Sequence, residues 1–283
     1  MFIRSLGIRG SLGGLSKQTE GVVDIFEAEG LKIFGASHKA AELEASKSFS
    51  KYIMEKYGIP TSKGQTFTRV QSARAYVKKV GAPIVVKAYG LAAGKGVILA
   101  QTEAEAIAAV DDMLAGNVFG EAGHRVVIEA FLQGEEASFI VMVDGEHCLP
   151  LATSQDHKAR DNGDTGPNTG GMGAYSPAPV VTPAIHDRVM QEVILPTVRG
   201  MAAEGHPYKG VLYAGLMIDR DKIKVLEFNG RFGNPEAQPL LPQKRAEIMA
   251  GRVPLNAREA LMPGSLKEVV IGPATASEIR LQR

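Results

Sequence analysis

The chain has 283 residues, 45% of them hydrophobic and 22% charged, which is enough for one large or two ordinary globular domains. Its 32 Lys and Arg residues nearly balance 31 Asp and Glu residues, so no strong positive field exists to attract a nucleic-acid backbone. The longest apolar runs, "FIVMV" and "VLYAGLMI", are far shorter than a membrane span. We therefore expect a cytoplasmic globular protein that binds neither nucleic acid nor membrane, with residues 1–20 poorly structured.

The first half of the chain alternates predicted helices and strands. Helices end at Gly and Pro residues and begin at side chains that can cap them, such as Ser46 and the pair Thr102 and Glu105. The predicted helices cover 21–30, 46–58, 72–80 and 102–116. The predicted strands, which are rich in β-branched residues, cover 31–35, 83–88, 97–101 and 125–131.

The second half begins with a predicted hairpin that turns at Asp144-Gly145, a strong two-residue turn pattern. Residues 155–176 are polar and glycine-rich, and we predict a long functional loop there. A helix capped by Thr182 follows, with a kink expected at Pro196. The last two predicted elements are antiparallel strands over 210–219 and 222–229.

The single cysteine, Cys148, lies in the apolar-rich run "HCLPLA". One cysteine permits no internal disulfide, and a thiol in such surroundings is typical of a buried, unreactive side chain. The sequence therefore predicts no catalytic role for Cys148.

A glycine-rich turn, "GLAAGKG" at 90–96, joins two of the predicted strands. Lys87 precedes the turn and Lys95 lies within it, which favours phosphate binding, although no Ser or Thr follows Lys95 as the usual phosphate loop requires. Lys87 lies in an otherwise apolar strand, where a buried ammonium needs an anionic partner. A fixed carboxylate and a nucleotide phosphate explain Lys87 equally well.

Side chains alternate along the last predicted strand, so Ile223, Val225, Glu227 and Asn229 are expected on one face. A carboxylate and an amide oxygen two residues apart are hard ligands suited to Mg²⁺. A solvated strand end with an ordinary Glu and Asn has the same spacing, so the spacing leaves both interpretations open.

Seven segments together resemble one family. They are "GLKIFG", "LEASKSFSKYIMEKYGIP", "GLAAGKGV", "DMLAGNVFGEAGHRVVIEAFLQGEEASF", "SQDHKARDNGDTGPNTGGMGAYSP", "YAGLMID" and "EFNGRFGNPEAQP". Over about 21–239 the chain resembles the phosphoribosylamine-glycine ligase (glycinamide ribonucleotide synthetase) family of ATP-grasp enzymes, which act in purine synthesis. The resemblance implies a fold class of mixed α+β and α/β type, an ATP-grasp fold with a small glycine-rich flap.

The same resemblance implies four parts of the chain. A partial N-terminal α/β segment covers 1–60, and a small lid subdomain covers 61–130. A large subdomain with the metal site covers 131–241, and a tail that does not continue the family pattern covers 242–283.

The resemblance also implies roles for individual residues. ATP is the expected cofactor, with Mg²⁺ or alternatively Mn²⁺ held by Glu227 and Asn229. Asp156, Lys158 and Arg231 are expected to contact the substrates. The expected catalytic residues are Lys87 and Arg231. The residues expected to bind ATP are Lys47, Lys87, Gly94, Lys95, Gly96, Glu129, Phe131, Leu132 and Glu136.

The implied reaction is ATP-dependent amide formation from two small molecules. The carboxylate of glycine would attack the γ-phosphate of ATP, and the amine of 5-phosphoribosylamine would then displace phosphate from glycyl phosphate. The products would be glycinamide ribonucleotide, ADP and phosphate. No covalent protein nucleophile is needed, and the sequence leaves the question of protein partners open.

The chain departs from the family pattern in several places. Tyr89 and Asn234 stand where the family has Asp, and Arg160 comes one place late after "SQDHKA". The family's N-terminal glycine-rich unit and its C-terminal domain are not matched, so the chain is interpreted as truncated at both ends. Three hypotheses follow: an active ligase, a non-catalytic ATP-binding remnant or fragment, and another ATP-grasp carboxylate-amine ligase.

Overall fold

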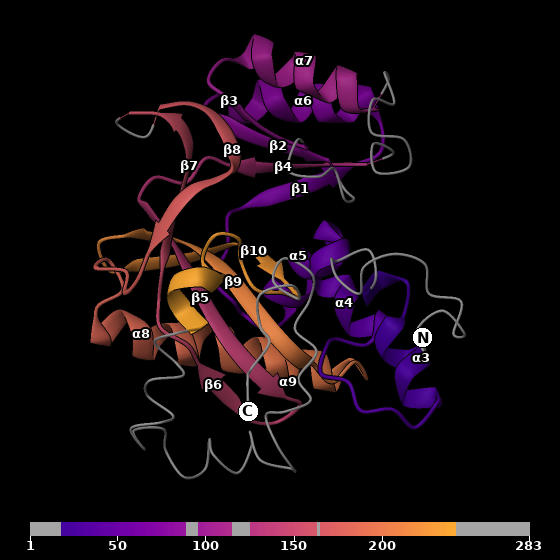
Figure 1. Ribbon diagram of the computed structural model, residues 1–283. Helices are drawn as coiled ribbons and strands as arrows, with labels where there is room; N and C mark the ends of the chain where they lie inside the picture. The colour runs from indigo at the N-terminus through magenta and orange to yellow at the C-terminus, as the bar shows by residue number, and fades with distance from the viewer. Residues whose placement is uncertain (1–17, 89–95, 115–124, 163–164, 242–283) are drawn as a thin grey trace.

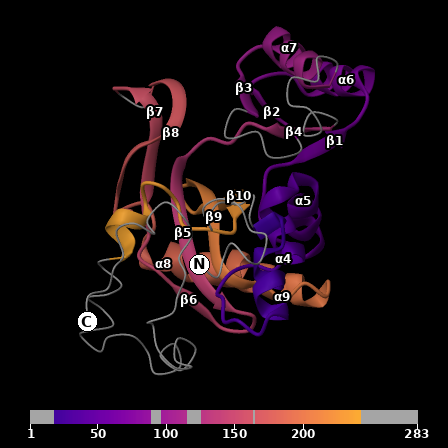
Figure 2. The same ribbon diagram turned by 45° about the vertical axis from the view of Figure 1, so that its right-hand side comes forward.

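The computed structural model describes residues 18–88, 96–114, 125–162 and 165–241. Two antiparallel sheets, each with helices packed against it, lie one above the other, and a two-stranded ribbon rises beside them (Figures 1 and 2). In the described residues, no helix combines the length and the apolar character needed to cross a bilayer.

The small sheet has the strand order β1-β4-β2-β3, and all neighbouring strands are antiparallel. Helices α6 (Val70–Val80) and α7 (Glu103–Leu114) pack against it at the top of Figure 1. Because β2 pairs directly with β3, the predicted glycine-rich turn does join the two strands of a hairpin. The strands are β1 (Gly64–Phe67), β2 (Ile84–Ala88), β3 (Val97–Ala100) and β4 (Val126–Ala130).

Alternation along β2 decides what each face of the small sheet carries. Ile84, Val86 and Ala88 pack into the core shared with α6 and α7. Val85 and Lys87 therefore point to the opposite face. The ammonium of Lys87 reaches the backbone of the large sheet on that side, where it donates to Leu226 O.

The large sheet has the strand order β10-β9-β5-β6 and is also antiparallel. Both predicted hairpins are confirmed. β5 pairs with β6 beyond Asp144-Gly145, and β9 pairs with β10 across Arg220-Asp221, where Arg220 has a φ of 58°. The strands are β5 (Glu135–Asp144), β6 (Cys148–Pro150), β9 (Lys209–Asp219) and β10 (Lys222–Asn229).

Helices cover the core face of the large sheet (Figure 1). The helix predicted after Thr182 consists of α8 (Pro183–Val189), a π-helical turn η2 (Met190–Ile194) and α9 (Leu195–Ala203). The π turn ends just before Pro196, which has no N–H and cannot continue the regular ladder. The irregularity in the helix is a π turn, and it lies just before the position at which the kink is predicted. The chain before the small sheet adds α3 (Val22–Ala28), α4 (His38–Ala45) and α5 (Lys47–Lys56).

The predicted helix caps are confirmed. Ser46 Oγ accepts from Phe49 N over 3.2 Å at the start of α5. Thr102 Oγ1 accepts from the N–H of Glu105 over 3.2 Å at the start of α7. At the start of α8, Thr182 Oγ1 accepts from the N–H of Ile185, three residues later, over 3.3 Å. Each side chain satisfies an N–H that has no partner inside its helix.

Two predicted elements were wrong. Residues 31–35 form no strand, because their backbone pairs with no sheet, while Phe34 packs against the hydrophobic cluster that contains Ile140 and Tyr213. Residues 155–176 are not a loop but an antiparallel ribbon made of β7 (Gln155–Asp161) and β8 (Thr165–Tyr175). A polar, glycine-rich segment lacks the hydrophobic alternation that predicts a strand, but backbone pairing needs no such alternation.

Candidate active site

Lys87 and Glu129 meet on the face of the small sheet that is turned toward the large sheet. Lys87 is opposite Val127 in the register of β2 and β4, so it is diagonal to Glu129. Lys87 Nζ lies 2.7 Å from Glu129 Oε2 and donates to Leu226 O over 3.2 Å. A fixed carboxylate is therefore one partner of Lys87, as one of the two interpretations of the sequence required.

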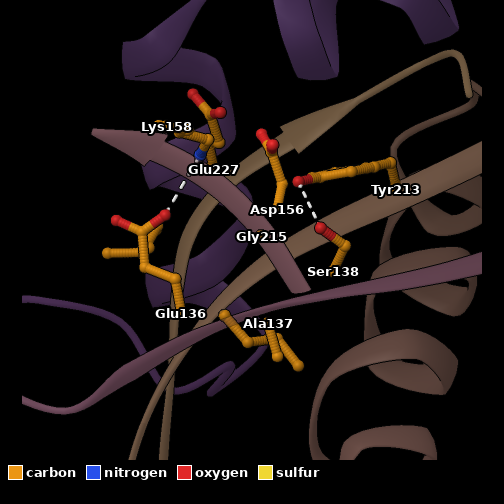
Figure 3. A pocket seen from close by; sticks show the side chains of 10 residues that line it. Glu136, Ala137, Ser138, Asp156, Lys158, Tyr213, Gly215 and Glu227 are labelled. Atoms are coloured by element: carbon orange, nitrogen blue, oxygen red, sulfur yellow. Dashed lines mark hydrogen bonds and ion pairs between the residues drawn. The ribbon is translucent and has the colours of Figure 1, made fainter. Parts of the chain in front are cut away.

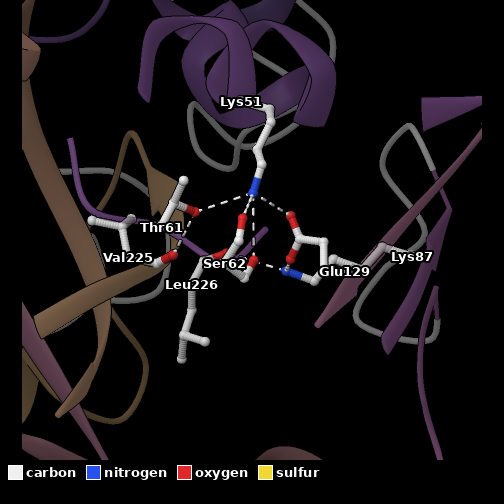
Figure 4. A network of polar contacts seen from close by, with 7 residues as sticks. All are labelled: Lys51, Thr61, Ser62, Lys87, Glu129, Val225 and Leu226. Atoms are coloured by element: carbon white, nitrogen blue, oxygen red, sulfur yellow. Dashed lines mark hydrogen bonds and ion pairs between the residues drawn. The ribbon is translucent and has the colours of Figure 1, made fainter. Parts of the chain in front are cut away.

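A second buried lysine, Lys51 of α5, binds the other oxygen of the same carboxylate (Figure 4). Lys51 Nζ lies 3.2 Å from Glu129 Oε1. It also donates to Thr61 Oγ1 over 3.3 Å, to Ser62 Oγ over 3.4 Å and to Ser62 O. Burial acts to raise the pKa of Glu129, but Lys87 and Lys51 outweigh it and hold that pKa below its ordinary value. Glu129 is therefore an ionised, buried carboxylate between two ammonium groups.

Lys47 lies at the start of α5, one helical turn before Lys51, and is half-buried. Burial lowers the pKa of its ammonium, and the positive charge of Lys87 lowers it further, while Glu227 acts in the opposite direction. Lys47 therefore lies within electrostatic range of both Lys87 and Glu227. Taken alone, its place on a helix would have indicated a solvent-facing lysine.

The predicted common face of Ile223, Val225, Glu227 and Asn229 was wrong. A β-bulge lies between Val225 and Glu227, so the strand changes which side it turns to the core. Val225 and Phe228, three residues apart, both lie in the core under the sheet. Glu227 and Asn229 still share a face with each other, but it is the face opposite Ile223 and Val225.

Glu227 lines a small hollow of about 20 Å³ on the exposed face of the large sheet (Figure 3). Glu136 of β5 and Lys158 of β7 form an ion pair of 3.1 Å beside it. This volume holds about one water molecule. The hollow is lined by Glu136, Ala137, Ser138, Asp156, Lys158, Tyr213, Gly215, Leu216, Leu226 and Glu227.

Two carboxylates lie near this hollow without full hydrogen bonding. Burial raises the pKa of Asp156 to about 6, and the charge of Glu236 raises it further. Glu236 is buried and its Oε1 accepts from Ser138 Oγ over 3.0 Å. Within the described residues, Asp156 Oδ1 and Glu236 Oε2 are buried and lack a hydrogen-bond partner. Oxygens of this kind are suited to a positively charged ligand group.

Arg231 follows β10 and is held by a buried carboxylate. Its Nε lies 3.4 Å from Glu44 Oε1, and the other oxygen of Glu44 accepts from Gly230 N over 2.5 Å. Arg231 Nη2 also lies 3.5 Å from Asn229 Oδ1. Burial raises the pKa of Glu44 to about 7, against the lowering effect of Arg231. The guanidinium remains about half exposed and can receive an anionic group.

A larger hollow of about 610 Å³ lies beside the link between the two sheets. Phe131 and Leu132 of that link line it, together with Tyr76 of α6 and Met217 and Lys224 of the large sheet. The volume falls within the range of ordinary ligand pockets. Phe131 and Leu132 therefore border a different hollow from Glu136, Asp156, Lys158 and Glu227.

The remaining predicted residues divide into two groups. Gly94, Lys95 and the departure Tyr89 lie outside the described residues. Gly96 is described and its carbonyl accepts from Ala88 N over 2.7 Å, which closes the β2-β3 pairing next to the turn. Cys148 is partly buried against the core, and burial raises the pKa of its thiol to about 11, in line with the unreactive thiol that was predicted.

The donor set of Glu227 and Asn229 fits a hard divalent cation, since one carboxylate and one amide oxygen point to the same side of β10. In the described part of the chain there is no group of three or more His, Cys, Asp or Glu side chains arranged for a metal. Two protein oxygens are typical of Mg²⁺ sites, where waters and phosphates complete the shell.

Sequence reasoning missed three residues of this site: Lys51, Glu44 and Glu236. Lys51 and Glu129 are 78 positions apart, and spacing within one helix does not reveal such a contact. Glu44 lies in α4, a helix that was not predicted. Glu236 could have been found, because it belongs to the quoted segment "EFNGRFGNPEAQP" and is a charged residue in a glycine-rich stretch.

Comparison with known proteins supports the resemblance. The family described as "Phosphoribosylglycinamide synthetase, ATP-grasp (A) domain" matches residues 45–237. The chain is 64% identical over 230 residues to phosphoribosylamine-glycine ligase of Salmonella typhimurium and 66% identical over 230 residues to that of Vibrio vulnificus. Both matches cover 81% of this chain and 54% of the relative, so the chain spans about half the length of these curated relatives.

Solved structures show the same fold. Phosphoribosylamine-glycine ligase of Thermotoga maritima aligns with a TM-score of 0.70 and 35% identity, over 79% of this chain and 55% of that one. Biotin carboxylase of Campylobacter jejuni aligns with a TM-score of 0.64 and 19% identity, over 80% of this chain and 48% of that one. The second match shows fold similarity alone, and both place the two sheets in the ATP-grasp fold.

Proposed function

Because this chain belongs to the phosphoribosylglycinamide synthetase ATP-grasp domain family, we propose that it binds ATP with a divalent metal and ligates glycine to 5-phosphoribosylamine. One observation carries the proposal. Lys47, Lys87 and Glu227 come from three different elements, yet the charges of Lys87 and Glu227 both act on the pKa of the Lys47 ammonium. Cations beside a carboxylate on facing elements suit a metal-bound triphosphate.

The ATP site in this proposal uses the residues expected from the sequence. Lys47 and Lys87 bind phosphates, Glu136 takes the ribose hydroxyls, and the link 129–132 borders the adenine. The flap with Gly94, Lys95 and Gly96 covers the triphosphate. Since the side chain of Glu129 is engaged by two lysines, its contribution to adenine binding would come from its backbone.

Glu227 and Asn229 would hold the metal, which we propose is Mg²⁺ with Mn²⁺ as a substitute. A bound divalent cation would neutralise part of the phosphate charge during transfer. Their shared face and the exposure of Glu227 support this role.

The substrates would bind beside the hollow between β5 and the ribbon. Arg231 is half exposed and offers a fork of N–H donors to a carboxylate or phosphate. Asp156 and Lys158 project from β7 into the same hollow. The carboxylate of glycine would attack the γ-phosphate of ATP, and the amine of 5-phosphoribosylamine would displace phosphate from glycyl phosphate. The ribbon would shield that acyl phosphate from water.

We propose the same division of the chain as the sequence implied, with a lid over 61–130 and a large part over 131–241. The lid would carry the flap, and the large part would carry the metal and substrate residues. Protein partners are not part of the proposal.

The test is ADP release from Mg-ATP by the purified chain, with glycine and freshly generated 5-phosphoribosylamine, against controls that lack each substrate. We expect release that requires both. Mg-ATP binding without release would identify a non-catalytic nucleotide-binding chain. Release that requires a different acid or amine would identify another carboxylate-amine ligase of the same fold.

A further inference from the structure

We propose that Lys51 is a positioning residue, which neutralises Glu129 so that Lys87 keeps its positive charge for a phosphate group. This inference rests on the proposed ATP-binding function, and it assigns to that site a residue that never touches the ligand.

Lys51 itself cannot bind a ligand in this arrangement. It is 7% exposed, and its ammonium is surrounded by Thr61 Oγ1, two oxygens of Ser62 and Glu129 Oε1 (Figure 4). An ammonium has three N–H donors, and these acceptors use all of them. An effect of Lys51 on a ligand therefore passes through its partners, among which Glu129 is the charged group.

Glu129 divides its two oxygens between two lysines. Oε1 faces Lys51 at 3.2 Å and Oε2 faces Lys87 at 2.7 Å. Two ammonium groups and one carboxylate leave a net charge of +1. Without Lys51, the carboxylate would cancel the charge of Lys87, and the group would present no net charge to a phosphate.

Lys87 is the member of the group that can use this charge. In the described residues it has two acceptors, Glu129 Oε2 and Leu226 O, which leaves one N–H for a phosphate oxygen. Leu226 immediately precedes Glu227, so the ammonium of Lys87 contacts the backbone next to a proposed metal ligand. Lys51 would thus set the charge at the place where the triphosphate meets both sheets.

Lys51 could instead serve only to tie α5 to β4. The two roles differ in what a second substitution does. If charge matters, Glu129→Gln should compensate for the loss of Lys51, because the pair of changes restores a net charge of +1. If only the tie matters, removing both partners cannot restore anything.

The experiment measures Mg-ATP affinity by isothermal titration calorimetry for the wild-type chain, Lys51→Gln, Lys51→Arg and Lys51→Gln/Glu129→Gln. Thermal unfolding of each variant checks folding, and Gln is chosen because it keeps N–H donors for Ser62 while it removes the charge. We expect Lys51→Gln to weaken binding by at least about tenfold, and Lys51→Arg to stay within about threefold of wild type. The double variant should bind at least about fivefold more tightly than Lys51→Gln.

Unchanged affinity in a folded Lys51→Gln variant would overturn the role of Lys51 while leaving the proposed function intact. A double variant no better than Lys51→Gln would also overturn it, because the loss would then be structural. If Lys51→Gln does not fold, the comparison of Lys51→Arg with wild type decides, and weakened binding there counts against a role for charge. Absence of Mg-ATP binding by the wild-type chain would instead overturn the proposed function, and this inference with it.

Discussion

Glu44 Oε1 lies 3.4 Å from Arg231 Nε, and this contact joins an unpredicted helix to the turn that follows β10. The carboxyl is almost fully buried, and burial raises its pKa from an ordinary value of 4.5 to about 7 despite the arginine. A group poised near neutral pH beside a candidate substrate residue makes both stability and binding sensitive to pH.

Glu44 should make the folded chain less stable as pH rises from about 4.5 to about 7. The folded state binds the proton more tightly than the unfolded state, so its advantage is complete below pH 4.5 and is lost as pH rises through 7. The loss can reach about 3 kcal/mol for this shift. Glu44→Gln should therefore reduce the fall in unfolding free energy between pH 5 and pH 8 by about 2 kcal/mol, as measured by urea unfolding.

Glu55→Gln, on the exposed side of α5, serves as the control. If the free energy of unfolding fell equally between pH 5 and pH 8 in the wild type and in Glu44→Gln, the predicted role of Glu44 would be wrong.

Glu227→Gln should weaken the binding of Mg-ATP by at least about tenfold, because it removes the one carboxylate of the proposed metal site. The side chain is exposed, so the free energy of unfolding should change by less than about 0.5 kcal/mol. Calorimetry with and without Mg²⁺ measures the first effect and chemical unfolding the second. Glu135→Gln, at the exposed start of β5, is the matched control. Wild-type affinity in Glu227→Gln would show that the metal is held elsewhere.

Gly171→Ala should destabilise the chain by about 2 kcal/mol or more, because its φ is 118° and a Cβ there would lie 2.6 Å from Pro235 Cδ. The same Cβ would lie 3.0 Å from Asp156 Oδ1, so the ribbon should shift relative to the turn at Pro235. Gly173→Ala is the matched control, since nothing lies within 4 Å of a Cβ at that position. Thermal unfolding of the two variants gives the comparison. Equal melting temperatures would mean that the ribbon is not held at Gly171.

Ser46→Ala should cost about 1 kcal/mol of stability, because Ser46 Oγ caps α5 by accepting from Phe49 N. The capped turn also carries Lys47, so the affinity for Mg-ATP should fall with it. Ser72→Ala, an exposed position inside α6, is the control and should leave stability unchanged or slightly higher. Denaturant unfolding of both variants tests this, and a Ser46→Ala variant as stable as wild type would mean that the cap is dispensable.

Local patterns predicted most of the elements, because each depended on neighbours in sequence. The caps at Ser46, Thr102 and Thr182 and the turns at Asp144-Gly145 were all visible as short motifs. The ribbon over 155–176 was not, because it buries little apolar surface and its strands are held by backbone pairing. Neither was the β-bulge before Glu227, since an extra residue in a strand leaves no mark on composition.

The candidate site was predictable in its residue types but not in its internal partners. Lys87, Glu129 and Glu227 could be named from motifs and resemblance. Glu129 binds two lysines, and one of them, Lys51, reaches it because α5 packs against β4. Such contacts join residues 42 and 78 positions apart, and no periodic pattern in a single sequence encodes them.

The bulge in β10 ties the spacing of the strand to two requirements at once. If the backbone paired regularly through Leu226, every residue after Val225 would lie on the other side of the strand. Phe228 would then turn to the open face, while the Glu227 carboxylate would enter the apolar core. A single-codon deletion of Leu226 would instead keep both side chains in place, because Glu227 and Phe228 would alternate regularly after Val225. The length of the strand at this point should therefore be freer to change than the sides on which Glu227 and Phe228 lie.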